Sequence, residues 1–350
     1  PPEKTWTEEK VSHTIEKIYR IADYIRDLEP WNDLYETDIF GIKIPESNRI
    51  YFISVMGSNG EYTAISAYKG YKGLFDFFKF QEEENSSGMN NLLTIPQLIL
   101  GFTDREDLEK SDLEAIKRSG LKFRGKGKWP KLHEIIPGFY PSFPEGETFE
   151  DLPVLLEQIA TFLPWVMDNY HLIYREADPF DEILVRVPSK ISGKLQWESH
   201  YETLDPEKAN VFYKLTYKSV TLDKVLKLNK ASVTFLIDLI ILPAPVKNTD
   251  NKGAFPFILL IVDKETGMVC GMPMMTPERD LSALYESLPQ KTLEAFFDQG
   301  YKPSKIEIRS KLLYEILHSI LKKIGCLPIL VDEMPVLDET VESLLDHFHK

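Results

Sequence analysis

The chain has 350 residues and carries 41 Lys and Arg against 55 Asp and Glu, a formal net charge of -14. Its 43% hydrophobic content excludes wholesale disorder, and its two cysteines exclude a disulfide scaffold. The excess of acids disfavours binding of nucleic acid or anionic membrane over the whole surface, since those partners carry the same sign of charge.

The length predicts two domains, and the apolar runs predict no membrane span. At roughly 100–200 residues per domain, we place the domains at 1-175 and 176-350. The strongest apolar runs are Phe235–Leu242, which Asp238 interrupts, and Phe255–Val262, and both are far shorter than the roughly 20 residues that cross a bilayer. The polar start of the chain lacks the basic and apolar segments of a signal peptide. We therefore expect a cytoplasmic protein.

The N-terminal half opens with an amphipathic helix over Glu8–Leu28. Thr7 is the expected cap and Pro30 the expected stop. Apolar residues recur along this helix at spacings of three and four: Val11, Ile15, Ile18, Ile21, Ala22, Ile25 and Leu28. The patterns that follow predict strands at Leu34–Ile44, Ile50–Met56 and Tyr62–Tyr68, a helix at Leu74–Glu84, a strand at Gln97–Phe102, a helix at Glu106–Arg118, a loop over Lys122–Pro144 and a long helix at Phe149–Asn169.

The C-terminal half repeats this order. Strands are expected at Ile183–Val187 and Phe212–Tyr217, and Val220–Leu228 fits either a short helix or a strand. Clearer patterns predict strands at Val233–Leu242, Phe255–Asp263 and Met268–Met275, a helix at Asp280–Asp298, a strand at Lys305–Arg309, a helix at Leu312–Ile324, a strand at Leu327–Val331 and a helix at Asp338–His347. The fold class is α+β, with two α/β-type domains that each begin with three antiparallel strands and continue with alternating helices and strands.

The shared order indicates a tandem duplication. When Trp31–Tyr68 is shifted onto Asp238–Met275, the expected strands coincide, and both hairpins carry a glycine, Gly60 and Gly267. The amino-acid identity between the two halves is poor, so chance agreement of the element order stays open as the alternative.

One segment reverses the charge of the chain. Between 122 and 131 lie five cations and two aromatic residues, with no acid among them: Lys122, Arg124, Lys126, Lys128, Lys131, Phe123 and Trp129. A period of two would place the first four cations on one exposed strand face. The segment would then bind a protein or a phosphate-bearing ligand, with Trp129 available for stacking. Alternatively, the cations pair with acids elsewhere, and Phe123 and Trp129 are core anchors.

Several other features carry no specific chemistry. Gly125-Lys126-Gly127 is not a dinucleotide fingerprint, and neither a P-loop nor a GxSxG nucleophile elbow occurs. Pro137–Pro144 predicts a rigid strap that wraps a domain or joins two. A cluster of methionines near Met268–Met275 fits either core filling or an adaptable binding surface.

The element order of Val233–His347 resembles the ribonuclease H-like fold. The nucleases of that fold carry acids in the first strand, the first helix, the end of the fourth strand and the last helix, which together hold Mg²⁺. Asp238 and Glu286 stand at the first two positions. Arg309 stands at the third, where its charge would compete with a cation, and Glu307 lies two residues earlier. The resemblance implies an alternative function as a divergent metal-dependent nuclease that uses Asp238, Glu286 and Glu307 with Mg²⁺.

Most of the chain also resembles an uncharacterised bacterial family made of two domains of unknown function, sometimes found beside plasmid ORF-3-like or SEC-C domains. The segments that carry this resemblance are Ser54–Glu61, Tyr68–Gly70, Gly120–Lys126, Trp129-Pro130, Pro137–Pro141 and Phe255–Asp263. The resemblance implies no activity, substrate or catalytic residue. We therefore expect a protein of unknown function, a non-catalytic binding or regulatory module without a cofactor.

Overall fold

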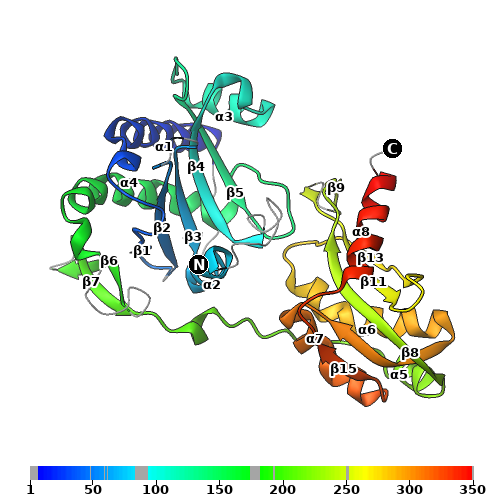
Figure 1. Ribbon diagram of the computed structural model, residues 1–350. Coiled ribbons are helices and arrows are strands. Elements are labelled where there is room, and N and C mark those ends of the chain that lie inside the picture. The colour runs from blue at the N-terminus through cyan, green and yellow to red at the C-terminus, as the bar shows by residue number, and fades with distance from the viewer. Residues whose placement is uncertain are drawn as a thin grey trace. The chain divides into compact units, whose positions relative to one another are not determined.

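The computed structural model describes residues 7–47, 49–58, 60, 62–82, 94–173, 182–191, 194–249 and 252–348. The chain forms two compact units (Figure 1). Unit 1 contains the chain up to Ile136 together with Pro141–Asn210, and unit 2 contains Pro137–Tyr140 and the chain from Val211 onward. Each unit combines helices with a mixed sheet, which confirms the expected α+β class and the two domains.

Unit 1 is built on a seven-stranded sheet in the order β5-β4-β3-β2-β1-β6-β7. Neighbouring strands are antiparallel except for the parallel pair β1 and β6. The strands are β1 (Phe40–Lys43), β2 (Ile50–Met56), β3 (Ala64–Lys69), β4 (Gln97–Thr103), β5 (Trp129–Ile135), β6 (Glu182–Ile191) and β7 (Lys194–Thr203). The α-helices are α1 (Glu8–Leu28), α2 (Gly70–Glu82), α3 (Lys110–Ser119) and α4 (Gly146–Asp168), and short 3-10 turns lie at Pro30–Asn32, Arg105–Asp107, Tyr170–Leu172 and Pro206–Ala209.

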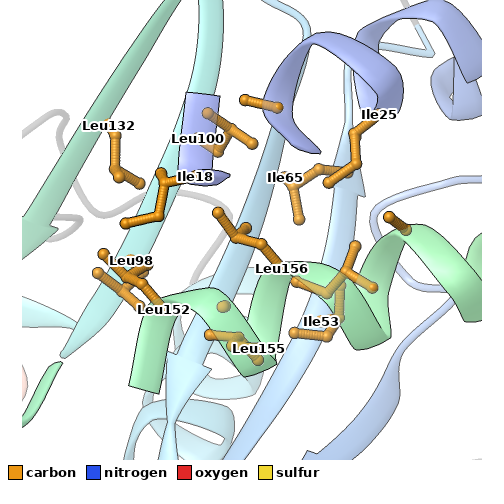
Figure 2. Close-up of a cluster of buried hydrophobic side chains, with 14 of the residues drawn as sticks. Ile18, Ile25, Ile53, Ile65, Leu98, Leu100, Leu132, Leu152, Leu155 and Leu156 are labelled. Atoms are coloured by element: carbon orange, nitrogen blue, oxygen red, sulfur yellow. The ribbon is translucent and has the colours of Figure 1, made fainter. Parts of the chain in front are cut away.

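Alternating apolar side chains give this sheet a core on each face. Helices α1, α3 and α4 cover one face, and α2 covers the other. Figure 2 shows the first core, where side chains from three sources interdigitate: Ile18 and Ile25 of α1, Leu152, Leu155 and Leu156 of α4, and Ile53, Ile65, Leu98, Leu100 and Leu132 of the sheet. On the second face, the rings of Tyr68 and Phe77 stack with their centroids 4.5 Å apart.

Helix α1 has the bounds that the sequence predicts, because its start and its stop are both local. The Lys10 backbone N–H donates to Thr7 Oγ1 over 3.3 Å, so Thr7 caps the helix. Glu29 adopts a left-handed conformation with φ 49° directly before Pro30, which ends the helix. The apolar stripe is buried against the sheet at Ile15, Ile18 and Ile25.

Unit 2 is built on a six-stranded sheet in the order β12-β11-β8-β14-β15, with β13 also paired to β11. Strands β12, β11 and β8 are antiparallel, and β14 and β15 continue parallel to β8. The strands are β8 (Asn229–Ile241), β9 (Val246–Lys247), β10 (Gly253–Ala254), β11 (Phe257–Asp263), β12 (Val269–Gly271), β13 (Met274–Met275), β14 (Tyr301–Ile308) and β15 (Leu327–Leu330). The helices are α5 (Ser219–Leu226), α6 (Ser282–Gln299), α7 (Lys311–Lys323) and α8 (Pro335–Phe348).

The two faces of the unit 2 sheet are covered by different helices. Phe235 and Ile237 of β8 face a core formed with α5, α6 and α7. Leu236 faces the opposite side, where Leu337 of α8 packs against it. This alternation along β8 places Asp238 on the α8 face, because it stands two residues after Leu236.

The two units do not divide near residue 175. The parallel pairing of Gly41 with Val185 adds the hairpin β6–β7 to the sheet of unit 1, so that unit extends to Asn210. Strand β7 is rich in polar residues, and most of its side chains are exposed. It therefore has little of the apolar alternation from which strands are predicted.

The sheet connections correct the expected tandem duplication. Both units follow the order of three strands, helix, strand, helix, strand and helix. In unit 1, however, the fourth strand β4 pairs antiparallel with the third strand β3. In unit 2, the fourth main strand β14 pairs parallel with the first strand β8. Equal element order therefore conceals two different sheets, and the halves are not copies of one architecture.

Two local expectations also need correction. Phe212–Tyr217 forms no strand, and the N–H groups of Thr216 and Lys214 donate instead to the carbonyl and the carboxylate of Glu286 on helix α6. The region expected as loop after Lys122 contains β5, whose pairing with β4 runs from Trp129 to Ile135. At the expected hairpin that carries Gly60, the neighbouring residues Asn59 and Glu61 lie outside the described residues.

The expected strap Pro137–Pro144 lies partly in unit 2. Pro137–Tyr140 belongs to that unit, where Phe139 forms a bridge with Ala254 and the Phe255 N–H donates to Gly138 O over 2.8 Å. Ser142 returns to unit 1, where it forms a bridge with Glu134. None of the helices in the described part of the chain combines the length and apolar character that a membrane crossing requires.

We predict that Gly73→Ala destabilises unit 1. Alanine in a helix is ordinarily worth about 0.5–1 kcal/mol over glycine. At Gly73 of α2, however, an added Cβ would lie 2.7 Å from the Pro96 carbonyl oxygen. We expect the free energy of unfolding, measured by urea denaturation, to fall by about 1–2 kcal/mol because the backbone must shift. A rise would show that the Pro96 segment yields freely.

Candidate functional site

The basic segment is a loop between α3 and β5. Residues 121–128 have no strand conformation, because Gly125 and Gly127 adopt positive φ values of 101° and 65°. The expectation of one strand face carrying Lys122, Arg124 and Lys126 is therefore wrong. We call residues 121–131 the basic loop.

Backbone contacts hold the basic loop in place. The Gly127 N–H donates to the Asp104 carboxylate over 2.6 Å, and the Arg26 guanidinium donates to the Lys128 carbonyl over 3.3 Å. Phe123 is buried in the α1 core, and its ring lies 6.1 Å from that of Tyr19. The loop is thus fixed through its backbone and through one aromatic anchor.

The cations of the loop fall into two groups. Lys122, Arg124, Lys126 and Lys128 are exposed, and in the part of the chain that the structure describes no ion pair engages any of them. Lys131 is partly buried, and its ammonium donates to the Asp107 carbonyl over 3.3 Å. Four charges therefore point to solvent, and one supports the loop.

Trp129 is an anchor of the loop. It begins β5 and is partly buried against the α1 core, with its ring 6.3 Å from that of Phe123. The Arg105 guanidinium lies 5.8 Å from its ring centroid. The core-anchor interpretation of Phe123 and Trp129 thus accounts for their packing, while stacking of a ligand on Trp129 stays a prediction.

Sequence reasoning missed two further cations beside the loop. Lys117 and Arg118 are exposed in the last turn of α3, and no ion pair of the described residues includes them. The available signal was the acid-free stretch between Glu114 and Glu134, which holds seven Lys and Arg residues in an otherwise acidic chain. That stretch, rather than the period-two spacing, marks the positive surface.

The basic loop also forms a wall of a groove of about 480 Å³. Its other walls include Trp31, Tyr62 and Phe102, and the rings of Trp31 and Phe102 lie 5.6 Å apart. Acids line it as well, among them Asp104 and Asp107. The groove is therefore of mixed charge, because Lys126 and Lys128 of the basic loop line it together with these acids.

A buried hydrogen-bonded pair connects the two elements that flank the loop. Asp112 of α3 and His133 of β5 are both buried, and Oδ1 and Nε2 lie 2.7 Å apart. The Glu109 N–H donates to the second carboxylate oxygen over 2.9 Å. Burial alone raises the pKa of Asp112, but the hydrogen bonds from His133 and Glu109 outweigh it, so the pKa lies below its ordinary value.

In unit 2, Arg309 occupies the place between the first strand and the last helix. Its guanidinium donates to Asp238 Oδ2 over 2.6 Å and to Asp338 Oδ1 over 2.8 Å. Burial lowers the pKa of Arg309, but the hydrogen bonds to both aspartates outweigh it and raise that pKa. Asp338, in the first turn of α8, was not among the expected acids.

The three acids expected to hold a metal have other partners. Glu307 accepts two hydrogen bonds from Lys264, each 2.8 Å long, and Glu286 accepts the Lys214 backbone N–H over 2.9 Å. Asp238 is paired with Arg309, as described above. No group of three or more His, Cys, Asp or Glu side chains among the described residues is arranged to hold a metal ion. These residues therefore do not fit a Mg²⁺ ion.

Comparison with protein families finds two matches, one after the other along the chain. Residues 16–186 match the family model of a domain of unknown function (DUF7309), and residues 221–345 match that of another domain of unknown function (DUF6930). The chain carries these two domains in tandem. This confirms the expected resemblance to a family of two uncharacterised domains. No match to the chain is found among the curated proteins.

The two matches place the candidate sites in different domains. The DUF7309 match contains the basic loop and the pair of Asp112 and His133, and the DUF6930 match contains Asp238, Arg309 and Asp338. Neither match assigns a function, which agrees with the expectation of unknown function.

We predict a pH-dependent contribution of Asp112 to stability. Because its folded pKa is depressed, its carboxylate stabilises the folded state at pH values above the unfolded pKa of about 3.9, and that stability is lost as the pH falls through the folded pKa. Asp112→Asn should lower the free energy of unfolding by about 1–2 kcal/mol at pH 7, and the difference from the unmodified protein should shrink below about pH 4. Urea titrations across this pH range measure both. A gap of equal size at every pH would contradict the assignment.

We also predict that Arg309→Ala destabilises unit 2 by about 1–3 kcal/mol. Removing one partner of a fully buried pair costs about 3–5 kcal/mol, and the 36% exposure of the Arg309 side chain reduces that figure. Asp338→Asn, on the more exposed side of the bridge, should cost less than about 1 kcal/mol. Denaturation of the three proteins under the same conditions provides the comparison. Equal losses would mean that Asp238 is not the dominant partner.

Proposed function

We propose that the protein is a non-catalytic binding module that holds a short phosphate-bearing ligand on the exposed cations of the basic loop. The observation that supports this most directly is a set of exposed cations that form no ion pair with the residues that the structure describes, on a loop whose backbone is held by hydrogen bonds: Lys122, Arg124, Lys126 and Lys128. A fixed loop with free cationic ends loses little conformational freedom when an anion binds.

The charge of the whole chain favours a short ligand over a long nucleic acid. A net charge of -14 repels a polyanion, but salt screens charges beyond about 8–10 Å. A ligand that contacts only the loop region therefore meets its positive field, whereas a long polyanion would also meet the acidic remainder. The groove beside the loop, with Trp31 and Phe102 among its walls, offers apolar contact to the part of the ligand that carries no phosphate.

The contacts in unit 2 favour binding over the alternative of a metal-dependent nuclease. The order β12-β11-β8-β14-β15, with three antiparallel strands followed by two parallel ones, supports the ribonuclease H-like resemblance. The Arg309 guanidinium, however, neutralises Asp238 and Asp338 where a nuclease of that fold would need a cation. This cation is part of the chain and cannot activate water as a bound metal does.

We predict that removing the four exposed charges abolishes anion binding. A fluorescein-labelled single-stranded oligonucleotide of about eight nucleotides and inorganic tripolyphosphate serve as probes. The variant K122Q/R124Q/K126Q/K128Q should bind either probe at least about tenfold more weakly. Neutralising four phosphates should give the unmodified protein a slope of log affinity against log salt near about -3 with the oligonucleotide. Fluorescence anisotropy between low and moderate salt measures both quantities.

The matched control removes four exposed lysines outside the acid-free stretch, as K194Q/K214Q/K218Q/K227Q. It changes the net charge by the same amount, so a general electrostatic effect would weaken both variants equally. Retained binding in the control and lost binding in the loop variant support the proposed site. Equal binding of both variants, or tighter binding of poly-glutamate than of tripolyphosphate, would contradict it.

A further inference from the structure

The DUF6930 sheet has an open edge at β12. In the order β12-β11-β8-β14-β15, and within the described part of the chain, β12 has a neighbouring strand on one side only. The pairing with β11 shifts register between Ile261 and Val262, and β13 continues along β11 after Pro273. An edge strand directs unpaired N–H and C=O groups outward, which can pair with an incoming extended chain.

This edge carries apolar side chains instead of the charges that usually protect such strands. Met268, Val269, Met272 and Met274 are between 41% and 65% exposed. Three of the four are methionines, whose flexible thioether side chains adapt to varied partners. Of the two uses foreseen for the methionine cluster, an adaptable surface is therefore the one that these three positions support.

A groove of about 590 Å³ lies directly beside the edge. Gly267 and Val269 line one side, and Val336, Thr340 and Leu344 of α8 line the other. These α8 residues follow each other at intervals of four, so they form one stripe along the helix. Val269 faces the groove, whereas Cys270 packs in the opposite core, as alternation along a strand requires. A strand added to β12 would send every second side chain into the groove.

The charge around the groove indicates the chemistry of its occupant. Among the described residues that line it there is no Lys, Arg or His, and Glu339 is one of them. Helix α8 carries Asp338, Glu339, Glu342 and Asp346 and no Lys or Arg. Antiparallel pairing of two copies through β12 would place both α8 helices on the same sheet face, acid beside acid, in chains that each carry a charge of -14. A second copy is therefore disfavoured.

We propose that β12 and the groove beside α8 bind an extended segment of another protein that has apolar residues at alternate positions and Lys or Arg at its ends. The backbone of the segment extends the sheet, its alternate apolar side chains enter the groove, and its basic ends meet Glu339 and Glu342. This interaction surface is independent of the basic loop in DUF7309, so loss of one binding activity leaves the other unchanged.

The test uses a labelled peptide of about nine residues with alternating valine and threonine and two lysines at each end. We expect saturable binding to the full chain by fluorescence anisotropy. Val269→Glu, which places a charge in the groove, should weaken binding by about tenfold or more. E339Q/E342Q should weaken it by about threefold to tenfold and remove most of its salt dependence. Because these two glutamates are exposed, that second variant keeps the proposal testable if Val269→Glu fails to fold.

The matched control is Leu327→Glu, a similarly exposed apolar residue on β15 at the other edge of the same sheet, and it should bind the peptide normally. Unchanged binding by Val269→Glu would overturn the proposal. Equal binding of a peptide that ends in glutamates would overturn its charge selectivity. If light scattering shows a dimer of the unmodified protein and a monomer of Val269→Glu, the occupant of this edge is a second copy of the chain and the proposal is overturned.

Discussion

Paired buried carboxylates hold the helices of the DUF7309 domain on its sheet. Asp112 of α3 meets His133 of β5, Glu134 of β5 meets Lys69 of β3 and Thr148 of α4, and Asp151 of α4 meets Arg49 and the hydroxyl of Tyr51. Because a buried carboxylate is costly without a partner, each pair fixes the relative position of two elements. Apolar packing brings these helices to the sheet, and the pairs determine where along it they rest. The pair of Asp112 and His133 in this way joins α3 and β5, the two elements that flank the basic loop.

The exposed cations of the basic loop contrast with the paired cations inside the domain. The chain contains more acids than bases, and inside the domain the cations Lys69 and Arg49 are matched with carboxylates. Cations that stay exposed and unmatched in an acidic protein are consistent with recognition of an external anion. Arg309 shows the opposite arrangement. It bridges two aspartates of DUF6930 that come from β8 and α8, and so joins the last helix to the sheet.

Local signals in the sequence predicted most elements, and non-local pairing explains what they missed. The bounds of α1 and β2 follow from a cap, a proline and apolar periodicity within the segments themselves. The position of β4 beside β3 and of β14 beside β8 depends on partners far away in the chain, and no local pattern distinguishes these two arrangements. For the site, composition identified the loop cations, but the positive φ of Gly125 and Gly127 removed the strand that spacing had indicated. Asp338 was missed because its importance comes only from its contact with Arg309.

The path of the chain through Pro137–Tyr140 cannot be inferred from the family matches. The chain leaves unit 1 for four residues, pairs with Gly253–Phe255 of unit 2 and returns. Gly138 is packed so closely against Leu281 and Pro277 that a Cβ would lie 2.7 Å from Leu281. A fragment that began at Val211 would therefore lack Pro137–Tyr140 and its hydrogen bonds to Gly253 and Phe255, although the DUF6930 match itself begins only at residue 221. Exchange of either domain as one contiguous block of sequence would therefore separate Pro137–Tyr140 from its hydrogen-bond partners at Gly253–Phe255.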